Sequence, residues 1–237
     1  MRVVKLIAAV VVFARVVEAV DWPNDLNELK TLTVEQAKEL AQHRYIVLNG
    51  LTTLSTEQAM ILAQQKGDYL SLGLTTLTDA QVEALAKSSG GLSLGLTTLP
   101  DEIAMALAQH KSTLCLNSVT TLSVEAAKAL AQQSGSLYLN GLTTLTDAQA
   151  EALAQHKGGL ELNGLTTLTD VQAEALAKRE GWWLSLHGLT TLTDAQAEAL
   201  AKHKGQLRFF FLTELSDKAA VKLRANEKIL LPDRFKR

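Results

Sequence analysis

The stretch LSLHGLTTLTDAQAEALAKHKG, residues Leu184–Gly205, is the unit from which the chain is built. Closely similar stretches begin at Leu137 and Leu160, and looser copies extend from Leu32 toward the C-terminus. The copies carry an anchor leucine every 22 to 24 residues, at Leu32, Leu54, Leu77, Leu99, Leu122, Leu145, Leu168, Leu192 and Leu215. A repeat of this length predicts a solenoid, a single array in which each unit stacks on its neighbours.

Each unit divides into a short strand and a helix. The alternating leucines of an L-x-L segment, such as Leu184 and Leu186, predict a strand with one buried face. Ser or Thr followed three residues later by Gln, as at Thr193 and Gln196, predicts a helix start at which both side chains cap free N–H groups. The glycine that follows each helix, such as Gly205, predicts a left-handed helix end.

Strand and helix repeated at constant pitch predict a parallel sheet on one side of the stack and helices on the other. Neighbouring strands lie about 4.8 Å apart, whereas helices need about 8–10 Å, so the stack should bend with its strands inside. Glutamate and lysine four residues apart, as at Glu198 and Lys202, predict ion pairs on the outer helix face.

The composition argues against several classes of protein. Of the 237 residues, 47% are apolar but only 5% are aromatic, which suits thin, regular layers of leucine and alanine. The formal net charge is −2, so the chain lacks the basic surface typical of nucleic-acid binding. Cys115 is the only cysteine, which excludes a disulfide within the chain.

The first residues have the features of a secretory signal. Basic residues precede the apolar segment Leu6–Ala14, and small side chains at Val17 and Ala19 match a cleavage site after Ala19. We predict a signal peptide at residues 1–19, which leaves a mature chain of net charge −4 with no transmembrane segment. The alternative is a short membrane anchor, although the apolar segment is too short to span a bilayer comfortably.

The pattern L-x-L-x-G-L-T-T-L-T-D-A-Q-A-E-A-L-A resembles leucine-rich repeats, most closely the bacterial and cysteine-containing subtypes, which also pair an L-x-L strand with a helix opened by T-D. The resemblance covers about residues 32–225. It implies an α/β fold: a right-handed, horseshoe-shaped solenoid with parallel strands inside and short helices outside. It also implies protein recognition through the strand face, with no catalysis and no cofactor.

Three segments are expected after the signal peptide: an N-terminal cap at residues 20–31, leucine-rich repeats at residues 32–215, and a C-terminal cap helix with its tail at residues 216–237. The bulky Arg208–Phe211 segment and the basic last helix suit a cap whose outer face meets water. The alternative is a basic docking tail.

The asparagines depart from the plant and receptor form of the repeat. They stand directly before glycine or serine, and we interpret them as turn residues rather than as a continuous inward ladder, at Asn49, Asn117, Asn140 and Asn163.

Four histidines share one column, eleven residues after their anchor leucines, at His43, His110, His156 and His203. Because these repeats are at least two turns apart, roughly 10 Å, their nitrogens cannot all come within about 2.1 Å of one zinc ion. We therefore predict no metal site, and interpret the column as polar or cationic caps of helix C-termini. No histidine neighbours Cys115 on the outward strand positions, so no nucleophile–base pair is predicted.

Threonine pairs recur once per turn, from Thr52 and Thr53 to Thr190 and Thr191. We expect one column of the two to be exposed, with hydroxyls bonded to neighbouring turns. The alternative is a regular row that binds ice or another lattice.

Any binding site is predicted at the variable, outward positions of the strands. Small residues occupy the middle of this face, while aromatic and charged residues gather in its C-terminal half, at Tyr138, Glu161, Trp183, Ser185, His187 and Arg208. Tyr, Trp and Arg are common anchors of interfaces, so we predict that these residues bind a ligand. The alternative is a scattered sheet exterior without a ligand.

The leading hypothesis is a non-enzymatic binding module, secreted or in the periplasm or cell envelope, that binds a protein or a cell-surface polymer and not nucleic acid. The alternative is a structural envelope protein that associates with itself and has no specific ligand. The near-identical repeats favour the second reading, and the variable strand positions favour the first.

Overall fold

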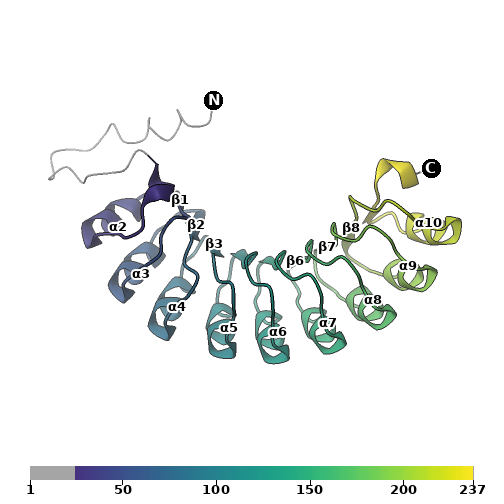
Figure 1. Ribbon diagram of the computed structural model, residues 1–237, viewed down its shortest axis with the longest axis horizontal. Coiled ribbons are helices and arrows are strands. Elements are labelled where there is room, and N and C mark those ends of the chain that lie inside the picture. The colour runs from purple at the N-terminus through teal and green to yellow at the C-terminus, as the bar shows by residue number, and fades with distance from the viewer. Residues whose placement is uncertain (1–24, 237) are drawn as a thin grey trace.

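The computed structural model describes residues 25–236. These residues form one open solenoid of nine strands and nine α-helices that alternate along the chain (Figure 1). The predicted signal peptide lies outside the described residues, and the predicted N-terminal cap is described only from Asp25 onward. There a short 3-10 helix, η1 (Leu26–Glu28), lies next to the first strand.

The nine strands are short and pair in chain order into one parallel sheet. Their bounds are β1 (Tyr45–Leu48), β2 (Tyr69–Leu72), β3 (Gly91–Leu94), β4 (Leu114–Cys115), β5 (Leu137–Tyr138), β6 (Gly159–Glu161), β7 (Trp183–Ser185), β8 (Gln206–Arg208) and β9 (Ile229–Leu230). The register pairs equivalent leucines of successive turns, for example Leu137 with Leu160 and Leu160 with Leu184. The strand β9, within the C-terminal segment, was not predicted from the sequence.

The helices are equally regular, each with seven or eight residues. Their bounds are α2 (Val34–Leu40), α3 (Thr56–Ala63), α4 (Asp79–Leu85), α5 (Asp101–Leu107), α6 (Val124–Leu130), α7 (Asp147–Leu153), α8 (Asp170–Ala177), α9 (Asp194–Leu200) and α10 (Asp217–Arg224). A second 3-10 helix, η2 (Asp233–Phe235), follows the last strand.

The stack bends into an arc with the strands inside and the helices outside, as the spacing argument predicts (Figure 1). The predicted leucine-rich horseshoe of parallel strands and short outer helices is thus confirmed.

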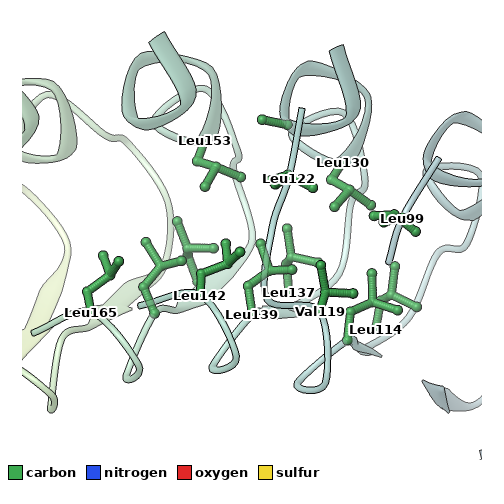
Figure 2. Packing of buried hydrophobic residues seen from close by; sticks show 14 of the residues in the cluster. Leu99, Leu114, Val119, Leu122, Leu130, Leu137, Leu139, Leu142, Leu153 and Leu165 are labelled. Atoms are coloured by element: carbon green, nitrogen blue, oxygen red, sulfur yellow. The ribbon is translucent and has the colours of Figure 1, made fainter. Parts of the chain in front are cut away.

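The core is a continuous layer of leucines and alanines between sheet and helices. Figure 2 shows Leu137, Leu139 and Leu142 of one turn beneath the helix residue Leu153. The first two and Leu153 are fully buried, and Ala150 beside them is too. A buried leucine contributes about 1.5–3 kcal/mol through the hydrophobic effect, and each turn shares its layer with the turns on either side.

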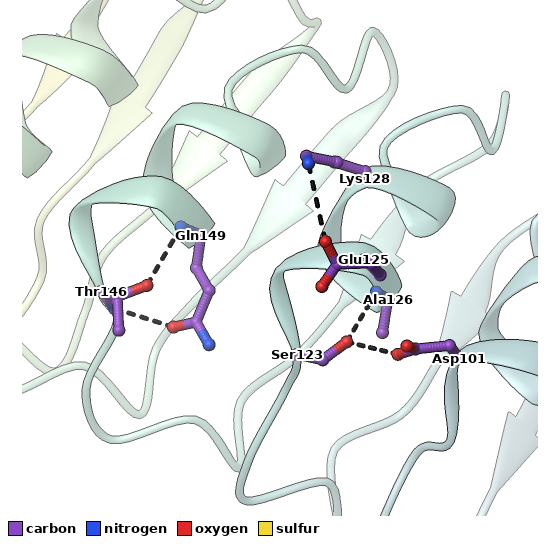
Figure 3. A network of polar contacts seen from close by, with 7 residues as sticks. All are labelled: Asp101, Ser123, Glu125, Ala126, Lys128, Thr146 and Gln149. Carbon is purple, nitrogen blue, oxygen red and sulfur yellow. Dashed lines mark hydrogen bonds and ion pairs between the residues drawn. The ribbon is translucent and has the colours of Figure 1, made fainter.

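The capping boxes are confirmed in the six helices where the sequence predicts them. Figure 3 shows one, in which Thr146 accepts from the Gln149 backbone while the Gln149 side chain accepts from the Thr146 N–H. The same glutamines have a second role that was not predicted. The Gln172 amide nitrogen donates to the carbonyl of Leu145, the anchor leucine of the preceding turn, at 2.8 Å.

This bond between turns recurs along the solenoid. The glutamines at positions 58, 81, 149 and 196 donate in the same way to the carbonyls of Leu32, Leu54, Leu122 and Leu168. One amide side chain therefore starts its own helix and also ties that helix to the turn before it.

A second row of bonds runs beside the first, at the helix starts. The capping hydroxyl of Thr169 donates to Asp147, the first residue of the preceding helix, at 2.9 Å. Ser123 donates to Asp101 in the same way (Figure 3). An aspartate at this position is also favoured by the helix dipole.

The prediction of left-handed glycines was wrong, because no described glycine has a positive φ. The residue that caps each helix C-terminus is alanine or a polar residue in right-handed helical conformation, as at Ala154 and Ala201, and the glycines come a few residues later. A Cβ added at Gly158 would overlap the backbone carbonyl of Gly135, and one at Gly205 would overlap that of Gly181. The glycines are needed for close approach of one turn to the next rather than for an unusual backbone conformation.

The predicted Glu–Lys pairs within helices were also wrong. Among residues 25–236, Glu198 and Lys202 do not form an ion pair, and most ion pairs join different turns. Glu180, for example, contacts Lys157 at 3.2 Å and Lys204 at 3.6 Å. These pairs are exposed, and each is expected to contribute little to stability.

Replacement of Gln172 by glutamate tests the bond between turns. Glutamate keeps the side-chain oxygen that accepts from the Thr169 N–H. It replaces the amide nitrogen that donates to the Leu145 carbonyl with a second oxygen, so that two acceptors face each other in a buried site. We expect Gln172→Glu to lower the free energy of unfolding by about 1–3 kcal/mol in urea titrations. The control is Gln155→Glu at an exposed position, which should change the free energy of unfolding by less than about 0.5 kcal/mol.

Candidate functional site

The strand face forms the inner side of the arc (Figure 1). Its outward side chains stand in columns because the strands pair in register. The central column runs from Tyr138 through Glu161 and Ser185 to Arg208, one residue per strand from β5 to β8. A parallel column runs from Gly159 through Trp183 to Gln206. The structure therefore brings five of the six predicted site residues onto adjacent strands, and His187 lies in the turn two residues after β7.

Trp183 is at the centre of this group. Its indole meets the Tyr138 ring edge-on, with 5.8 Å between centroids. On its other side the guanidinium carbon of Arg208 lies 5.1 Å from the ring centroid, within the range of a cation–π contact. The indole leans over Gly159, where any side chain would overlap it. We call Tyr138, Glu161, Trp183 and Arg208 the strand-face patch; all four are half-buried.

The two charged members of the patch are each held by an amide side chain two residues away on the same strand or its extension. The Arg208 Nε donates to the Gln206 side-chain oxygen at 2.8 Å. The Asn163 amide donates to the Glu161 carboxylate. Burial raises the pKa of the Glu161 carboxyl, against the opposing effects of Asn140, Asn163 and the Arg208 charge. The amides Gln206 and Asn163 were not recognised from the sequence as supports of the site.

Ser185 differs from the other predicted site residues. Only 2% of it is exposed, and its hydroxyl donates to the Asn163 side-chain oxygen at 2.7 Å. The alternation of the strand places Ser185 on the outward side, but its short side chain lies below the surface that the larger neighbours form. Its role in the structure is to hold Asn163, and a ligand does not reach it without rearrangement.

The asparagines do form turns, as predicted, but they also form a ladder that was not predicted. The Asn117 side-chain oxygen accepts from the Asn140 N–H, that of Asn140 accepts from Asn163, and that of Asn163 accepts from the His187 N–H. The ladder is interrupted where the sequence has Gly73 and Gly95 instead. His187 thus occupies the next position of the asparagine row.

The His187 ring is part of an aromatic cluster at the rim of the strand face. It stacks on Phe210, with centroids 4.2 Å apart and planes 16° from parallel, and meets Phe211 edge-on at 6.2 Å. Phe210 and Phe211 are 51% and 65% exposed. We call these three residues the rim cluster. The phenylalanines were predicted to belong to the cap. Their place shortly after Arg208, which pairs with Ser185 two residues before His187, was the signal that could have identified them.

Cys115 lies in the N-terminal continuation of the central column, paired with Ser93 and Tyr138. It is a free thiol with 9% of its surface exposed, and burial raises its pKa. A raised pKa reduces the fraction of reactive thiolate at neutral pH. In residues 25–236, no group of three His, Cys, Asp or Glu residues is placed to hold a metal ion.

The predicted histidine column is buried more deeply than expected. His110, His156 and His203 are at most 1% exposed, as are Gln133 and Arg179 between them. His110 Nδ1 lies 3.3 Å from the carbonyl of Ala86, the C-cap residue that follows the preceding α4, and His203 Nδ1 lies 3.4 Å from that of Ala177, the last residue of α8. Polar capping of a helix C-terminus, one turn back, is therefore confirmed for these two histidines. His156 Nε2 instead lies 3.2 Å from the carbonyl of Gly159, and His43 is only half-buried.

The cationic version of this interpretation does not fit. Burial lowers the pKa of His110 and of His203, and burial together with the nearby Arg179 charge lowers the pKa of His156 to about 4. These imidazoles are neutral at pH 7. The buried Arg179 guanidinium donates to the carbonyls of Trp183 and Gly158 and, among the described residues, has no carboxylate partner.

The expectation that only one column of the threonine pairs is exposed was wrong, because both members are exposed, as at Thr143 and Thr144. Bonding to neighbouring turns is seen at Thr52, whose hydroxyl donates to Lys30, and at Thr213, whose hydroxyl donates to Thr190. The rows follow the bend of the solenoid, which does not suit a flat lattice (Figure 1).

Comparison with known proteins gives similarity in fold but not in sequence. No protein-family model matches the chain, and no curated protein sequence matches it. An internalin from Listeria monocytogenes is similar in structure over 84% of this chain and 56% of its own, with 12% identity and a TM-score of 0.50. A leucine-rich-repeat protein of Leptospira interrogans aligns with 80% of this chain and 52% of its own, with 21% identity and a TM-score of 0.46.

The chain therefore spans about half the length of these two proteins. Its parallel sheet, outer helices and repeat pattern define the class as an open α/β solenoid. More narrowly, the chain has the leucine-rich-repeat fold, as the sequence pattern predicts. No helix within residues 25–236 has the length and apolar character needed to cross a bilayer.

Acid should destabilise the fold through the histidine column. The unfolded His156 imidazole titrates near 6.5, whereas its folded pKa is about 4. Above pH 6.5 both states are neutral, so the group has no effect. Between these two pKa values only the unfolded state takes up the proton. The free energy of unfolding therefore decreases as the pH is lowered, and the total loss is roughly 3 kcal/mol once the pH is below about 4.

The variant His156→Gln, which copies Gln133 of the same column, should remove this contribution. Urea unfolding near pH 7 and near pH 5 should show a loss on acidification that is about 2 kcal/mol smaller than in the wild type. The reciprocal variant Gln133→His should lose more stability in acid than the wild type. Equal pH dependence in all three proteins would contradict the assignment.

Proposed function

We propose that this chain is a non-enzymatic leucine-rich-repeat module that binds a protein partner through the C-terminal half of its strand face. The observation that carries the proposal is the contact of Trp183 with both Tyr138 and Arg208 on the inner face of the arc. Three residue types that dominate binding energy in interfaces are thereby held together in one half-buried group.

The surroundings of the patch support this proposal. The rim cluster adds two exposed phenylalanines next to the patch, through His187 and the neighbouring positions of β8. Apolar side chains exposed together on an otherwise polar surface commonly mark an interaction site. The amide supports Gln206 and Asn163 fix the charged side chains before a partner arrives, which reduces the entropy lost on binding.

The absence of catalysis is part of the proposal. A cysteine nucleophile needs a neighbouring base and a lowered pKa, whereas burial raises the pKa of Cys115 and its column neighbours are Ser93 and Tyr138.

Paired variants test the binding face. Trp183→Ala with Arg208→Ala should reduce capture of a partner, in pull-downs or protein arrays, by at least about 100-fold in affinity. The matched control is Trp182→Ala with Lys204→Ala, which removes an exposed tryptophan and an exposed cation outside the patch. An equal loss of affinity in both double variants, or no loss in either, would contradict the proposed binding face. If a glycan polymer is captured and no protein is, the partner is a polymer and the proposal of a protein partner is wrong.

Secretion to the exterior, the periplasm or the cell envelope is also part of the proposal, and it depends on the N-terminal residues. Intact mass spectrometry of the exported protein should show a chain that begins at Val20. Retention of Leu6–Ala14 in a membrane-bound product would support the anchor instead.

A further inference from the structure

Glu161 and Arg208 are opposite charges in one column of the strand face, yet they do not pair. Ser185 stands between them in the register, so their backbones are two strands apart, roughly 10 Å. Among residues 25–236, neither side chain forms an ion pair with any other group. Both are half-buried, where an unpaired charge has lost part of its hydration.

Each charge is bonded to its amide support rather than to the other charge. Asn163 donates to the Glu161 carboxylate, and Gln206 accepts from two nitrogens of the Arg208 guanidinium. The guanidinium also lies against the Trp183 ring. These contacts use only part of the bonding capacity of each charge, because a carboxylate can accept about four hydrogen bonds and a guanidinium can donate five.

An aromatic side chain comes from β7, the strand between the two charged residues, in the neighbouring column. Trp183 leans over Gly159, two residues before Glu161 on the same strand, and on its other side it contacts Arg208. Along the sheet, the three residues therefore come in the order Glu161 on β6, Trp183 on β7 and Arg208 on β8, and the Trp183 ring leans back toward β6. A complementary ligand has the reverse order: a cation, an apolar group and an anion.

We propose that the strand-face patch recognises an extended peptide segment of the pattern basic–x–apolar–x–acidic, in either chain direction, with the basic side chain on Glu161 and the acidic one on Arg208. This inference rests on the proposed protein-binding function and specifies the chemistry of the partner. In an extended chain, alternate side chains point to one face, so all three recognised residues face the patch.

The dimensions of such a peptide fit the patch. Residues four apart in an extended chain are about 13 Å apart at the backbone, and flexible charged side chains can converge on targets roughly 10 Å apart. The middle residue then lies over Trp183. An acidic side chain can form a two-point contact with the Arg208 guanidinium, which a neutral residue cannot form.

Selection of short random peptides displayed on phage, against the immobilised chain, tests the pattern. The wild type should enrich peptides with a basic and an acidic residue on either side of an apolar one. Selection against Glu161→Gln should show no preference for the basic residue but should keep the preference for the acidic residue. Selection against Arg208→Gln should keep the preference for the basic residue and lose that for the acidic residue. Affinity of a selected synthetic peptide should fall at least about ten-fold in each variant, and also in high salt.

The controls separate this inference from the function on which it depends. Glu174→Gln with Lys178→Gln, on the outer helix face, should leave selection and affinity unchanged. If the wild type enriches peptides without a charge preference, and this enrichment is lost in Trp183→Ala, the proposed charge pattern is wrong but the proposed binding face is correct. If no enrichment occurs, or if it survives Trp183→Ala, both are wrong. Binding of a neutral glycan in place of peptides also overturns the proposal.

Discussion

A single strand and helix of this chain cannot enclose a core, so every turn must bury its leucines against the next turn. This requirement explains most of the repeated residues. The paired strands bring equivalent leucines together, glycines such as Gly158 allow the backbones to approach, and each capping glutamine fastens a helix to the preceding turn. Stability in such an array is carried by the contacts between neighbouring turns more than by any one turn.

The sequence was sufficient to predict the repeat, the strand–helix alternation, the bend and the capping boxes, because each depends on a local pattern with a fixed period. It was not sufficient where a residue acts on the turn before its own. The Gln172 bond to Leu145, the Gly205 contact with Gly181 and the histidine bonds to the preceding helices all lie 21 or more residues away in the chain. A local pattern gives no signal for such contacts.

The candidate site illustrates the same limit. Alternation along the strands was enough to identify Trp183 and Arg208 as outward residues, and the structure places them in contact. It did not separate Ser185, which is buried, from its larger neighbours, because burial there depends on the size of side chains on adjacent strands. The bulk of Phe210 and Phe211 suggested the end of the fold, although Phe210 stacks on His187 one turn earlier and Phe211 meets it edge-on.

Trp183 leans over Gly159 of the preceding turn and carries Arg208 of the following turn against its ring. In a modular view of repeat proteins, each repeat can be exchanged independently of the others. Here, however, Trp183 requires a residue without a side chain, Gly159, on one neighbouring turn and a cation, Arg208, on the other. Tyr138 of β5 also contacts the ring, so a graft of this surface onto another leucine-rich array must carry four successive repeats together. The smallest unit that can be inherited, shuffled or redesigned with its recognition intact is a run of four turns.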